Sequence, residues 1–452
     1  MSIFICKRKS ATIVLTIIMS CFSGISLAAD LYQVIDLGKL GEVLNDETMR
    51  SAEAFSINDS GYIVGNASDE NPGTHAFIYQ NNSMTELGYL EHFVLSTTKP
   101  KVPIEEPSSF AFGLNDLYAV GYSLESEVTE ITAADQSISY TISNTEWALF
   151  YDISNLAINR IPQFVPDAPQ NARAVAINNN NLVVGTGLFD PADGNDTDGN
   201  ELTGLYRRGF FYNIDTDSLL MVAPLEGVNS KRNIRLRAVN DTGLAVGLSG
   251  LIVDEVGSVE VVLVDVNDPE TVEKIEIFGK GSQTPWAINN AGKIVGFAIN
   301  NSKVLEAFVY DTEIDTVTGL GFLNDKFKDS EAFDINESDQ IVGLSQVQNS
   351  PSVYHAFLYE NNTLKDINKL ISCEDSSAWQ LNEARSINDS GVITGTGVFE
   401  GEIRAYMLMP IAGSAPNCGD DSSGDSGSVP VISVLLLTIL AWGRRKNQSS
   451  LI

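Results

Sequence analysis

Residues 332–343 read AFDINESDQIVG, and residues 355–359, a short distance on, read HAFLY. The first stretch consists of an apolar segment ending in Asn, a polar turn, and a second apolar segment ending in Gly. This Asn-to-Gly block occurs seven times, at Asn58, Asn115, Asn178, Asn240, Asn289, Asn336 and Asn388. Successive Asn residues lie 47 to 63 positions apart, a repeat length that suits a four-stranded propeller blade.

Each block predicts a tight hairpin between two strands. The position three residues after the Asn is Gly, Asn or Asp in the six copies that have a seven-residue Asn-to-Gly spacing. These residue types tolerate the left-handed backbone that a tight hairpin turn requires. We therefore interpret the repeated Asn as part of a turn, since a turn is needed in every repeat and an active site only once. The six residues are Gly61, Asn181, Gly243, Gly292, Asp339 and Gly391.

Two further strands complete each repeat. Segments such as 75–79 (HAFIY) and 355–359 (HAFLY) are apolar on both faces, which predicts a third strand buried between neighbouring blades. Fourth strands are expected at 87–90, 320–323 and 367–370, with looser equivalents in repeats two, three and four.

Repeat seven lacks a fourth strand, whereas an unassigned copy at 34–40 precedes repeat one. An N-terminal strand that completes the last blade would account for both facts and would leave no open edge. The predicted fold is therefore all-β, a seven-bladed β-propeller over residues 30–412 whose last blade is closed by the N-terminal strand.

The repeat at 332–343 and 355–359 resembles the HAF repeats of a family of extracellular bacterial proteins. The resemblance spans about residues 32–411 and recurs in each repeat, with copies two and four departing most. It implies the propeller fold and a location outside the cell. It implies no activity, because the family brings none with it.

The two ends of the chain resemble targeting segments. Residues 1–29 combine a basic start, an apolar run and small residues before Asp30, which predicts a signal peptide; Cys21 within the run leaves a lipid anchor as the alternative. A Gly/Ser/Asp linker at 413–428 precedes an apolar segment with a basic end at 429–446. This tail resembles the GlyGly-CTERM sorting signals that a rhombosortase-type protease cuts, and the alternative is a plain C-terminal anchor. We expect the body at the cell surface, at the outer membrane or outside the cell.

Charge excludes two classes of partner. The chain has 59 acidic against 28 basic residues, a formal net charge of −31. Such a charge repels nucleic acid and anionic lipid, so membrane contact is expected only through the C-terminal tail. The excess of acidic residues is typical either of a solvated surface or of a protein that binds divalent cations.

Cysteines and one acidic loop give the candidate sites. After removal of the signal peptide, Cys373 and Cys418 remain, either as a disulfide or as two free thiols. The loop from 190 to 201 is rich in carboxylates and Gly, which supply the oxygen ligands that calcium prefers. It predicts a calcium site, the only cofactor expected, with the alternative of a solvated acidic loop. The candidate ligands are Asp193, Asp196, Asp198 and Glu201.

No catalytic motif stands out in the sequence. His75 and His355 occupy equivalent positions in repeats one and six, and we expect both to be structural. The favoured function is a non-enzymatic binding, adhesion or scaffold module for an extracellular glycan or protein. Its binding surface would be the long insertions at 93–107, 125–146 and 190–207. The alternatives are an extracellular polysaccharide hydrolase or lyase that uses carboxylates in the central funnel, and a structural component of the envelope or matrix.

Overall fold

The computed structural model describes residues 31–40, 51–68, 73–90, 108–132, 138–162, 171–189, 206–222, 225, 233–250, 259–279 and 281–411. The chain divides into two units, 1–416 and 417–452, and every described residue belongs to the first. The expected signal peptide, the linker at 413–428 and the tail at 429–446 lie outside the described residues.

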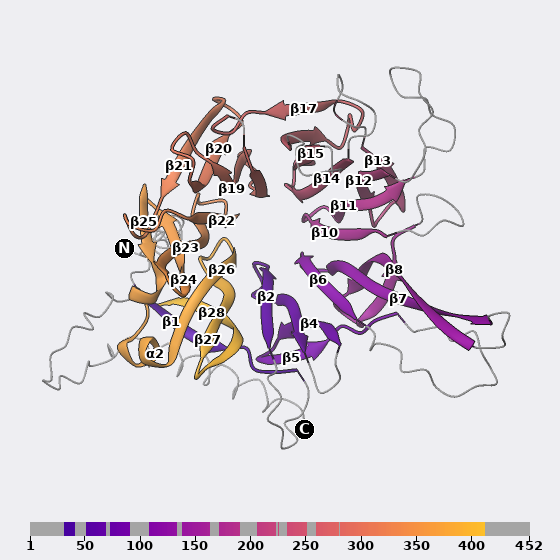
Figure 1. Cartoon of the computed structure of the whole chain (residues 1–452), viewed down its shortest axis with the longest axis horizontal. Helices are drawn as coiled ribbons and strands as arrows, with labels where there is room; N and C mark the ends of the chain where they lie inside the picture. The colour runs from indigo at the N-terminus through magenta and orange to yellow at the C-terminus, as the bar shows by residue number, and fades with distance from the viewer. Residues whose placement is uncertain are drawn as a thin grey trace, which may run out of the picture. The chain divides into compact units, whose positions relative to one another are not determined.

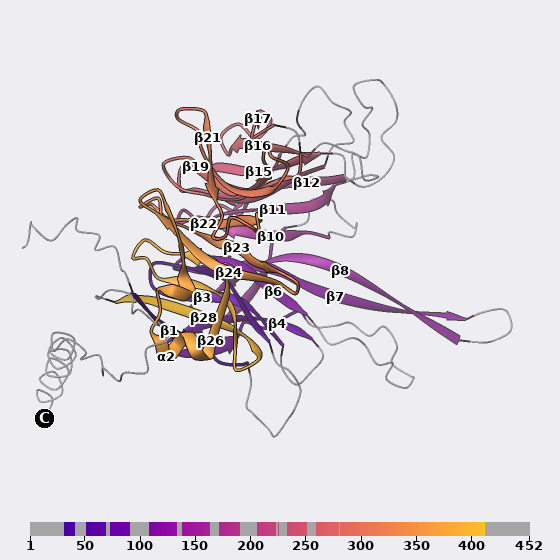
Figure 2. The same cartoon turned by 60° about the vertical axis from the view of Figure 1, so that its left-hand side comes forward.

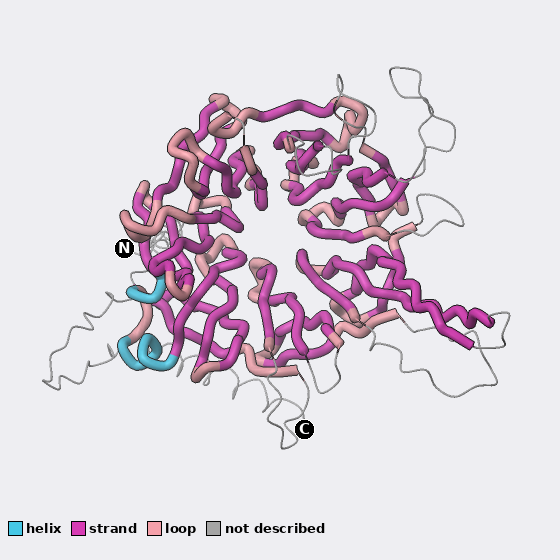
Figure 3. The backbone as a smooth tube through the Cα atoms, viewed as in Figure 1, coloured by secondary structure: helices cyan, strands magenta, loops and turns pink. Residues whose placement is uncertain are grey.

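The described residues form seven four-stranded antiparallel sheets arranged as the blades of a β-propeller (Figures 1 and 3), which confirms the predicted fold. Blades 1 to 6 each contain four consecutive strands, ordered from the axis outward. Blade 1 has β2 (Ala52–Ile57), β3 (Ile63–Ser68), β4 (Thr74–Gln80) and β5 (Ser83–Glu86); blade 2 has β6 (Ser109–Leu114), β7 (Tyr118–Thr132), β8 (Ile138–Asp152) and β9 (Ala157–Arg160); blade 3 has β10 (Arg173–Ile177), β11 (Leu182–Phe189), β12 (Tyr206–Asn213) and β13 (Ser218–Met221). Blade 4 has β14 (Asn233–Val239), β15 (Leu244–Gly250), β16 (Glu260–Asp265) and β17 (Val272–Ile275); blade 5 has β18 (Gln283–Ile288), β19 (Lys293–Ile299), β20 (Leu305–Asp311) and β21 (Thr316–Gly321); blade 6 has β22 (Ser330–Ile335), β23 (Ile341–Asn349), β24 (Ser352–Glu360) and β25 (Thr363–Asp366).

Blade 7 joins the two ends of the propeller. It contains β26 (Trp379–Ile387), β27 (Ile393–Phe399) and β28 (Glu402–Ile411), and its outer strand is β1 (Leu31–Asp36). β1 pairs antiparallel with β28, with Leu31 opposite Ile411 and Asp36 opposite Tyr406. The predicted closure by the N-terminal strand is confirmed. Two short helices, η1 (Ile367–Lys369) and α2 (Cys373–Ala378), connect blades 6 and 7.

The bounds predicted for the fourth strands were wrong by a few residues. The closing strand is 31–36 rather than 34–40, and the fourth strands of blades 1 and 6 end at Glu86 and Asp366, before the apolar segments at 87–90 and 367–370. In blade 5 the strand covers only the first two residues of the segment at 320–323. Leu87 and Ile367 are buried, so these segments anchor the blade after its last strand has ended. Gly38 and Gly88 have φ of +87° and +84°, which turns the chain out of the ladder.

The predicted turns are confirmed. All six residues expected in a left-handed conformation have positive φ, from +57° at Asn181 to +87° at Gly243. In blade 1 the Gly61 N–H donates to the Asn58 carbonyl, and the Asn58 side-chain oxygen accepts from the Tyr62 N–H at 2.8 Å. The same pair of contacts recurs in other blades, for example at Asn388 and Val392.

The repeated Asn also links each blade to the next, a role that the sequence did not reveal. The Nδ2 of every repeat Asn donates to the backbone carbonyl of the Asn in the following blade, at 2.8 to 3.2 Å.. The last bond runs from Asn388 to Asn58, so the seven bonds form a closed circle, which we call the Asn belt. All seven Asn residues are buried. The belt fixes the spacing of the inner strands around the axis, whatever the lengths of the loops elsewhere.

The hydrophobic core lies between neighbouring blades. In the third strand of blade 1, Ala76, Phe77 and Ile78 are fully buried, as predicted for a strand covered on both faces. The β7–β8 hairpin departs from this pattern, since its two strands of 15 residues extend well beyond the blade (Figure 2). The insertion at 125–146, expected to be a loop, is therefore mainly a paired β-hairpin, from Glu125 opposite Thr145 to Thr132 opposite Ile138.

Candidate functional site

Every inner strand carries a one-residue register shift against its neighbour, three residues before the repeat Asn. In blade 1 the register changes between Ala54 and Ser56, so Phe55 is the extra residue. Such β-bulges redirect a side chain relative to the regular pleat. We call these extra residues the bulge residues: Phe55, Phe112, Val175, Arg237, Trp286, Phe333 and Arg385.

The bulge explains the repeated Gly. A Cβ placed on Gly343 would lie 2.0 Å from the backbone oxygen of Glu331, on the inner strand of the same blade. The equivalent glycines of the other six blades place a Cβ 1.7 to 2.2 Å from the corresponding oxygen. The inner strand thus approaches the second strand so closely that only Gly fits. The spacing of Asn and Gly in each repeat specifies both the turn and the bulge.

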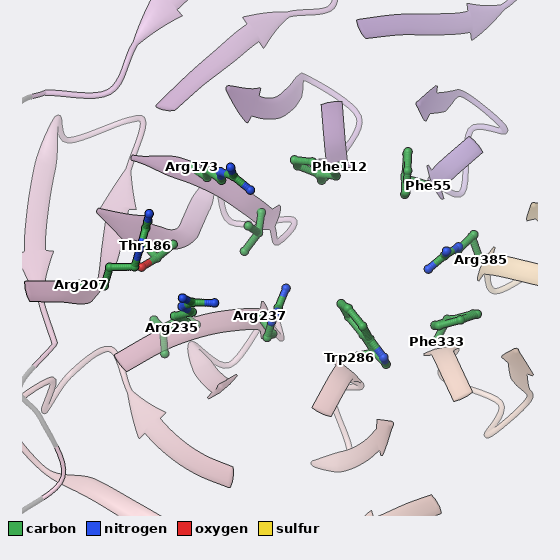
Figure 4. A pocket seen from close by; sticks show the side chains of 12 residues that line it. Phe55, Phe112, Arg173, Thr186, Arg207, Arg235, Arg237, Trp286, Phe333 and Arg385 are labelled. Carbon is green, nitrogen blue, oxygen red and sulfur yellow. The ribbon is translucent and has the colours of Figure 1, made fainter. Parts of the chain in front are cut away.

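All seven bulge residues line one cavity of about 570 Å³. Arg173, Thr186, Arg207, Arg235 and Leu236 complete its wall. Figure 4 shows Arg173, Arg207, Arg235 and Arg237 on one side of this central pocket, with Phe55, Trp286, Phe333 and Arg385 on the other. The wall therefore contains five arginines and four aromatic rings in a chain with a net charge of −31.

Two of the five arginines are neutralised by carboxylates. Arg173 binds both carboxylate oxygens of Glu146, with Nε 2.7 Å from Oε2, and its guanidinium lies 4.6 Å from the Tyr122 ring centre. Arg385 pairs with Glu383 at 2.9 Å and lies over the Phe333 ring at 4.2 Å. Both are half-buried, and their orientation is fixed by an ion pair and a ring.

The other three arginines have no carboxylate partner among the described residues. They are Arg207, Arg235 and Arg237, all from blades 3 and 4. Burial lowers the pKa of Arg235, and the charges of Arg207, Arg237 and Arg173 lower it further. Burial, together with the charge of Arg173, likewise lowers the pKa of Arg237. The Nε atoms of Arg235 and Arg237 are buried without a hydrogen-bond partner within the described part of the chain. Arg237 stacks on Trp286 at 4.8 Å.

Carboxylates lie beside the opposite wall. Glu53, Glu331 and Glu383 stand five residues before the repeat Asn in blades 1, 6 and 7, at the level where blades 3 and 4 carry Arg173 and Arg235. Burial raises the pKa of Glu53, and the charge of Glu383 raises it further, against the opposing effect of Arg385. The pKa of Glu331 is raised by burial, by Asp329 and by Glu383. This mouth of the propeller is thus basic on one side and acidic on the other.

An apolar layer follows the bulge residues along the axis. The residue before each repeat Asn is Ile, Leu or Val, and at most 9% of each is exposed: Ile57, Leu114, Ile177, Val239, Ile288, Ile335 and Ile387. These seven residues, which we call the aliphatic septum, line a second cavity of about 240 Å³ and none of them lines the central pocket. The second cavity opens at the Asn end, among Asp59, Asp116, Asp241, Glu337 and Asp389. The central pocket and this second cavity therefore have no lining residue in common.

The strand ends from which the predicted binding insertions depart lie at the arginine mouth. In an antiparallel blade, the link between the second and third strands is at the opposite end from the Asn turn. Glu146, at the base of the β7–β8 hairpin, binds Arg173, and Arg207 is the second residue of the third strand of blade 3. The insertions at 93–107 and 190–205 themselves are outside the described residues.

The other predicted sites have mixed outcomes. The calcium candidates Asp193, Asp196, Asp198 and Glu201 lie outside the described residues, so this site stays a prediction. Cys373 is disulfide-bonded, but Cys418 is not among the described residues, and their pairing also stays a prediction. Within the described ranges, no group of three His, Cys, Asp or Glu residues is arranged to hold a metal ion.

The two strand histidines make equivalent contacts. Nδ1 of His75 lies 3.0 Å from Glu86 and Nδ1 of His355 lies 3.1 Å from Asp366, each an acid on the fourth strand of the same blade. Burial raises the pKa of Asp366, but the hydrogen bond and charge of His355 lower it by more, and the net pKa is below its ordinary value. Both contacts fit the structural role expected for these histidines.

Sequence reasoning missed the pocket arginines and aromatic rings. The signal was present, because counting three and five residues back from each repeat Asn gives Phe55, Arg237, Trp286 and Arg385, and then Arg173 and Arg235. The expectation of catalytic carboxylates in the funnel stays a prediction: no Asp or Glu lines the central pocket, and Glu383 beside it pairs with Arg385. Arg207 comes from a third strand and had no such signal.

Comparisons with known proteins give a family match and a fold match. A family model described as "Protein of unknown function (DUF3466)" matches residues 253–407. No curated protein sequence matches the chain. Solved structures with similar folds include an oligogalacturonate lyase in complex with manganese, which is 12% identical with a TM-score of 0.48 over 85% of this chain and 95% of that one. Others are an oligogalacturonate lyase from Vibrio parahaemolyticus, 12% identical with a TM-score of 0.47 over 84% and 96%, and dipeptidyl peptidase 4 from Porphyromonas gingivalis, 11% identical with a TM-score of 0.41 over 79% and 52%.

In the described part of the chain, no helix has both the length and the apolar character needed to cross a bilayer.

Proposed function

We propose that the protein is a non-enzymatic, exported binding propeller and that its ligand occupies the central pocket. The observation that carries this proposal is the alignment of seven bulge residues on one cavity of about 570 Å³. Ligand sites are typically concave, lined mostly by apolar and aromatic groups, with a few polar groups that fix orientation. The pocket has this composition, with four rings and five guanidiniums. The export segment at 1–29, the tail at 413–446 and the resemblance to HAF repeats support a location outside the cytoplasm.

This proposal moves the binding site inward from the loops. The long insertions belong to the first three repeats, and the strands that carry them end at the mouth of the pocket. In this proposal the bulge residues make the main contacts with the ligand. A substitution deep in the cavity tests this assignment.

Val175→Trp provides that test. Val175 is the smallest of the bulge residues, so a Trp at this position fills the pocket without changing its charge. The matched control is Ile314→Trp on the outer part of blade 5, where the native side chain is 64% exposed. Both variants and the wild type would be screened on glycan and cell-surface arrays, with circular dichroism to check folding. We expect Val175→Trp to lose the binding that Ile314→Trp retains. A folded Val175→Trp variant with unchanged binding would show that the ligand binds elsewhere.

A second candidate function is hydrolysis or lyase cleavage of an extracellular polysaccharide. One observation favours it: Glu53, Glu331 and Glu383 come from consecutive blades, and the pKa values of Glu53 and Glu331 are raised. A carboxyl with a raised pKa can stay protonated and act as a general acid beside an ionised one. In this function Glu331 would donate the proton to the leaving group and Glu383 would act as the base.

The test for catalysis is turnover of a polysaccharide panel by the wild type and by Glu331→Gln. Release of reducing ends or of unsaturated products by the wild type, reduced at least about a hundredfold in the variant, would establish the enzyme and displace the binding proposal. Glu260→Gln is the matched control, because Glu260 is a partly buried glutamate that pairs with Lys274 on outer strands of blade 4. Equal loss in both variants would show that the effect is structural.

A further inference from the structure

We propose that the ligand of the central pocket is a sugar that carries one acidic group, held with that group against blades 3 and 4. This inference rests on the proposed function, because it assigns a chemical class to the ligand of the same site. The acidic group is a carboxylate, sulfate or phosphate, which share the oxygen geometry that guanidinium recognises.

The arginine wall carries unneutralised positive charge. Arg207, Arg235 and Arg237 carry three positive charges with no carboxylate partner among the described residues. By contrast, Arg160, Arg173, Arg385 and Arg404 each pair with an acid. In a chain with 59 acidic residues, a partner for every arginine would be easy to supply. Because no described residue supplies a carboxylate at this wall, an external anion can take that role.

The three arginines reach the same pocket. Arg235 and Arg237 are two residues apart on β14 and point into the same pocket, while Arg207 reaches it from β12 in the neighbouring blade (Figure 4). The Nε–H groups of Arg235 and Arg237 are buried, and neither donates a hydrogen bond within the described residues. Removing these groups from water costs free energy that an oxyanion would recover through charge-assisted hydrogen bonds. The guanidinium stack of Arg237 on Trp286 holds one donor set in place.

The facing wall of the pocket is aromatic. Phe55, Phe112, Trp286 and Phe333 present aromatic surface from blades 1, 2, 5 and 6. A pyranose ring has an apolar face of C–H groups and a rim of hydroxyls, so it can pack on aromatic rings and donate hydrogen bonds at its edge. Glu53, Glu331 and Glu383 are not among the residues that line the pocket, but they stand on the same inner strands as its wall and can accept hydrogen bonds from hydroxyls near the mouth. An inorganic anion alone would leave the aromatic wall and these carboxylates unused.

The charges around the pocket limit the ligand to one acidic group. The three carboxylates would repel a second anionic group on the far side of the pocket, and the net charge of −31 repels extended polyanions as they approach. The pocket therefore fits an acidic monosaccharide or the end residue of a chain.

The experiment is isothermal titration calorimetry on the full protein with defined probes. The acidic probes are glucuronate, glucose 6-sulfate and glucose 6-phosphate; glucose, inorganic sulfate and inorganic phosphate are the comparison probes. Arg235→Met and Arg237→Met remove one charge each while keeping apolar volume, and they relieve the repulsion within the arginine group, so folding is expected to survive. Arg160→Met is the matched control, because Arg160 also stacks on a Trp, at 4.3 Å, and pairs with a Glu, but on the outer strand of blade 2.

We expect at least one acidic sugar to bind, and Arg235→Met or Arg237→Met to weaken it by roughly tenfold or more, since each removes a charge-assisted bond. Arg160→Met should leave its affinity unchanged. If glucose binds as tightly as the acidic sugars, the acidic group is not recognised and the inference is overturned. If free sulfate or phosphate binds as tightly as the acidic sugars, the sugar ring is not recognised and the inference is overturned as well. If no acidic sugar binds, the inference is overturned. None of these outcomes decides the proposed function, which is tested separately by whether Val175→Trp abolishes the binding found on the arrays.

Discussion

Asn58 and its six equivalents show how much a single residue can do in this fold. The Asn58 side-chain oxygen accepts a hydrogen bond from its own turn, and its Nδ2 donates to the carbonyl of Asn115 in the next blade. The first contact is local, so the sequence predicted it from the residue types around the Asn. The second joins residues 57 positions apart, and nothing in one repeat indicates it. It becomes visible only when the blades are placed side by side.

Asp334 provides a pH prediction at the same scale. Its carboxyl is buried between blades 6 and 7, where it accepts hydrogen bonds from Ser386, Ile387 and Ile335. Burial raises the pKa of Asp334 to about 6, against the lowering effect of those hydrogen bonds. Between about pH 4 and 6 the unfolded chain has lost this proton while the folded chain retains it, so this group makes folding less favourable as the pH rises through that window.

Asp334→Asn removes the titration. We expect the wild type to lose roughly 1–3 kcal/mol of unfolding free energy relative to the variant as the pH rises from about 4 to 6, and the difference to stay constant above about 7. Urea unfolding at half-unit pH steps measures both curves, and the titration of all other groups cancels in the difference. Parallel curves across this range would show that Asp334 is already ionised in the folded protein at pH 4.

At the scale of strands, the bulge and its Gly form one unit. The bulge redirects a side chain into the central pocket, and Gly343 or its equivalent makes room for the inner strand. The sequence predicted a hairpin here, because Gly and alternating apolar residues mark one. It did not predict the bulge, since a one-residue register shift depends on how two strands pair. This is why the pocket-lining positions were missed even though their residues stand at fixed distances from each Asn.

Gly343→Ala tests the unit. The new Cβ would meet the Glu331 oxygen at 2.0 Å, and the backbone cannot move without opening the bulge. We expect a loss of about 3 kcal/mol or more in unfolding free energy, at the upper end of overpacking costs. Gly401→Ala is the control, because Gly401 has φ of +88° but free space around it, and its loss should be about 1 kcal/mol. Equal losses measured by urea unfolding would contradict a steric role for Gly343.

Two other elements show where sequence reasoning reaches its limit. The third strands were predicted well because burial on both faces produces a continuous apolar segment such as 355–359. The fourth strands were placed too late, because the buried Leu87 and Ile367 anchor the blade from just outside the ladder. The β7–β8 hairpin was read as a loop, because the segment at 125–146 has no counterpart in the other repeats.

At the scale of the whole molecule, ring closure was the most informative prediction. An unassigned strand at one end and a missing strand at the other are both visible in the sequence, and they identify a ring without any contact being known. The sequence did not predict the wall of the pocket. It depends on which of seven strands face one another across the axis, and that arrangement brings together Arg173, Arg237 and Arg385 from three different blades.

Replacing residues 31–36 with a Gly-Ser segment tests the closure. β28 would lose its partner over six residue pairs and leave an open edge on blade 7. We expect a lower melting temperature and self-association, seen by light scattering on a sizing column, because an unpaired edge recruits other strands. Replacing 316–321 in the same way removes an outer strand from a blade whose chain is continuous on both sides. If that variant loses as much stability as the first, closure by the N-terminal strand has no special role.

The aliphatic septum gives the two openings of the propeller independent evolutionary histories. A substitution among the acidic residues at the Asn end leaves the arginine wall unchanged, because no residue that lines the second cavity also lines the central pocket. A change of charge at the Asn end would act on a charged ligand in the central pocket only through the long-range field, which salt screens. Each opening can therefore acquire, change or lose a specificity while the other keeps its own, and a single scaffold of this kind can diversify twice.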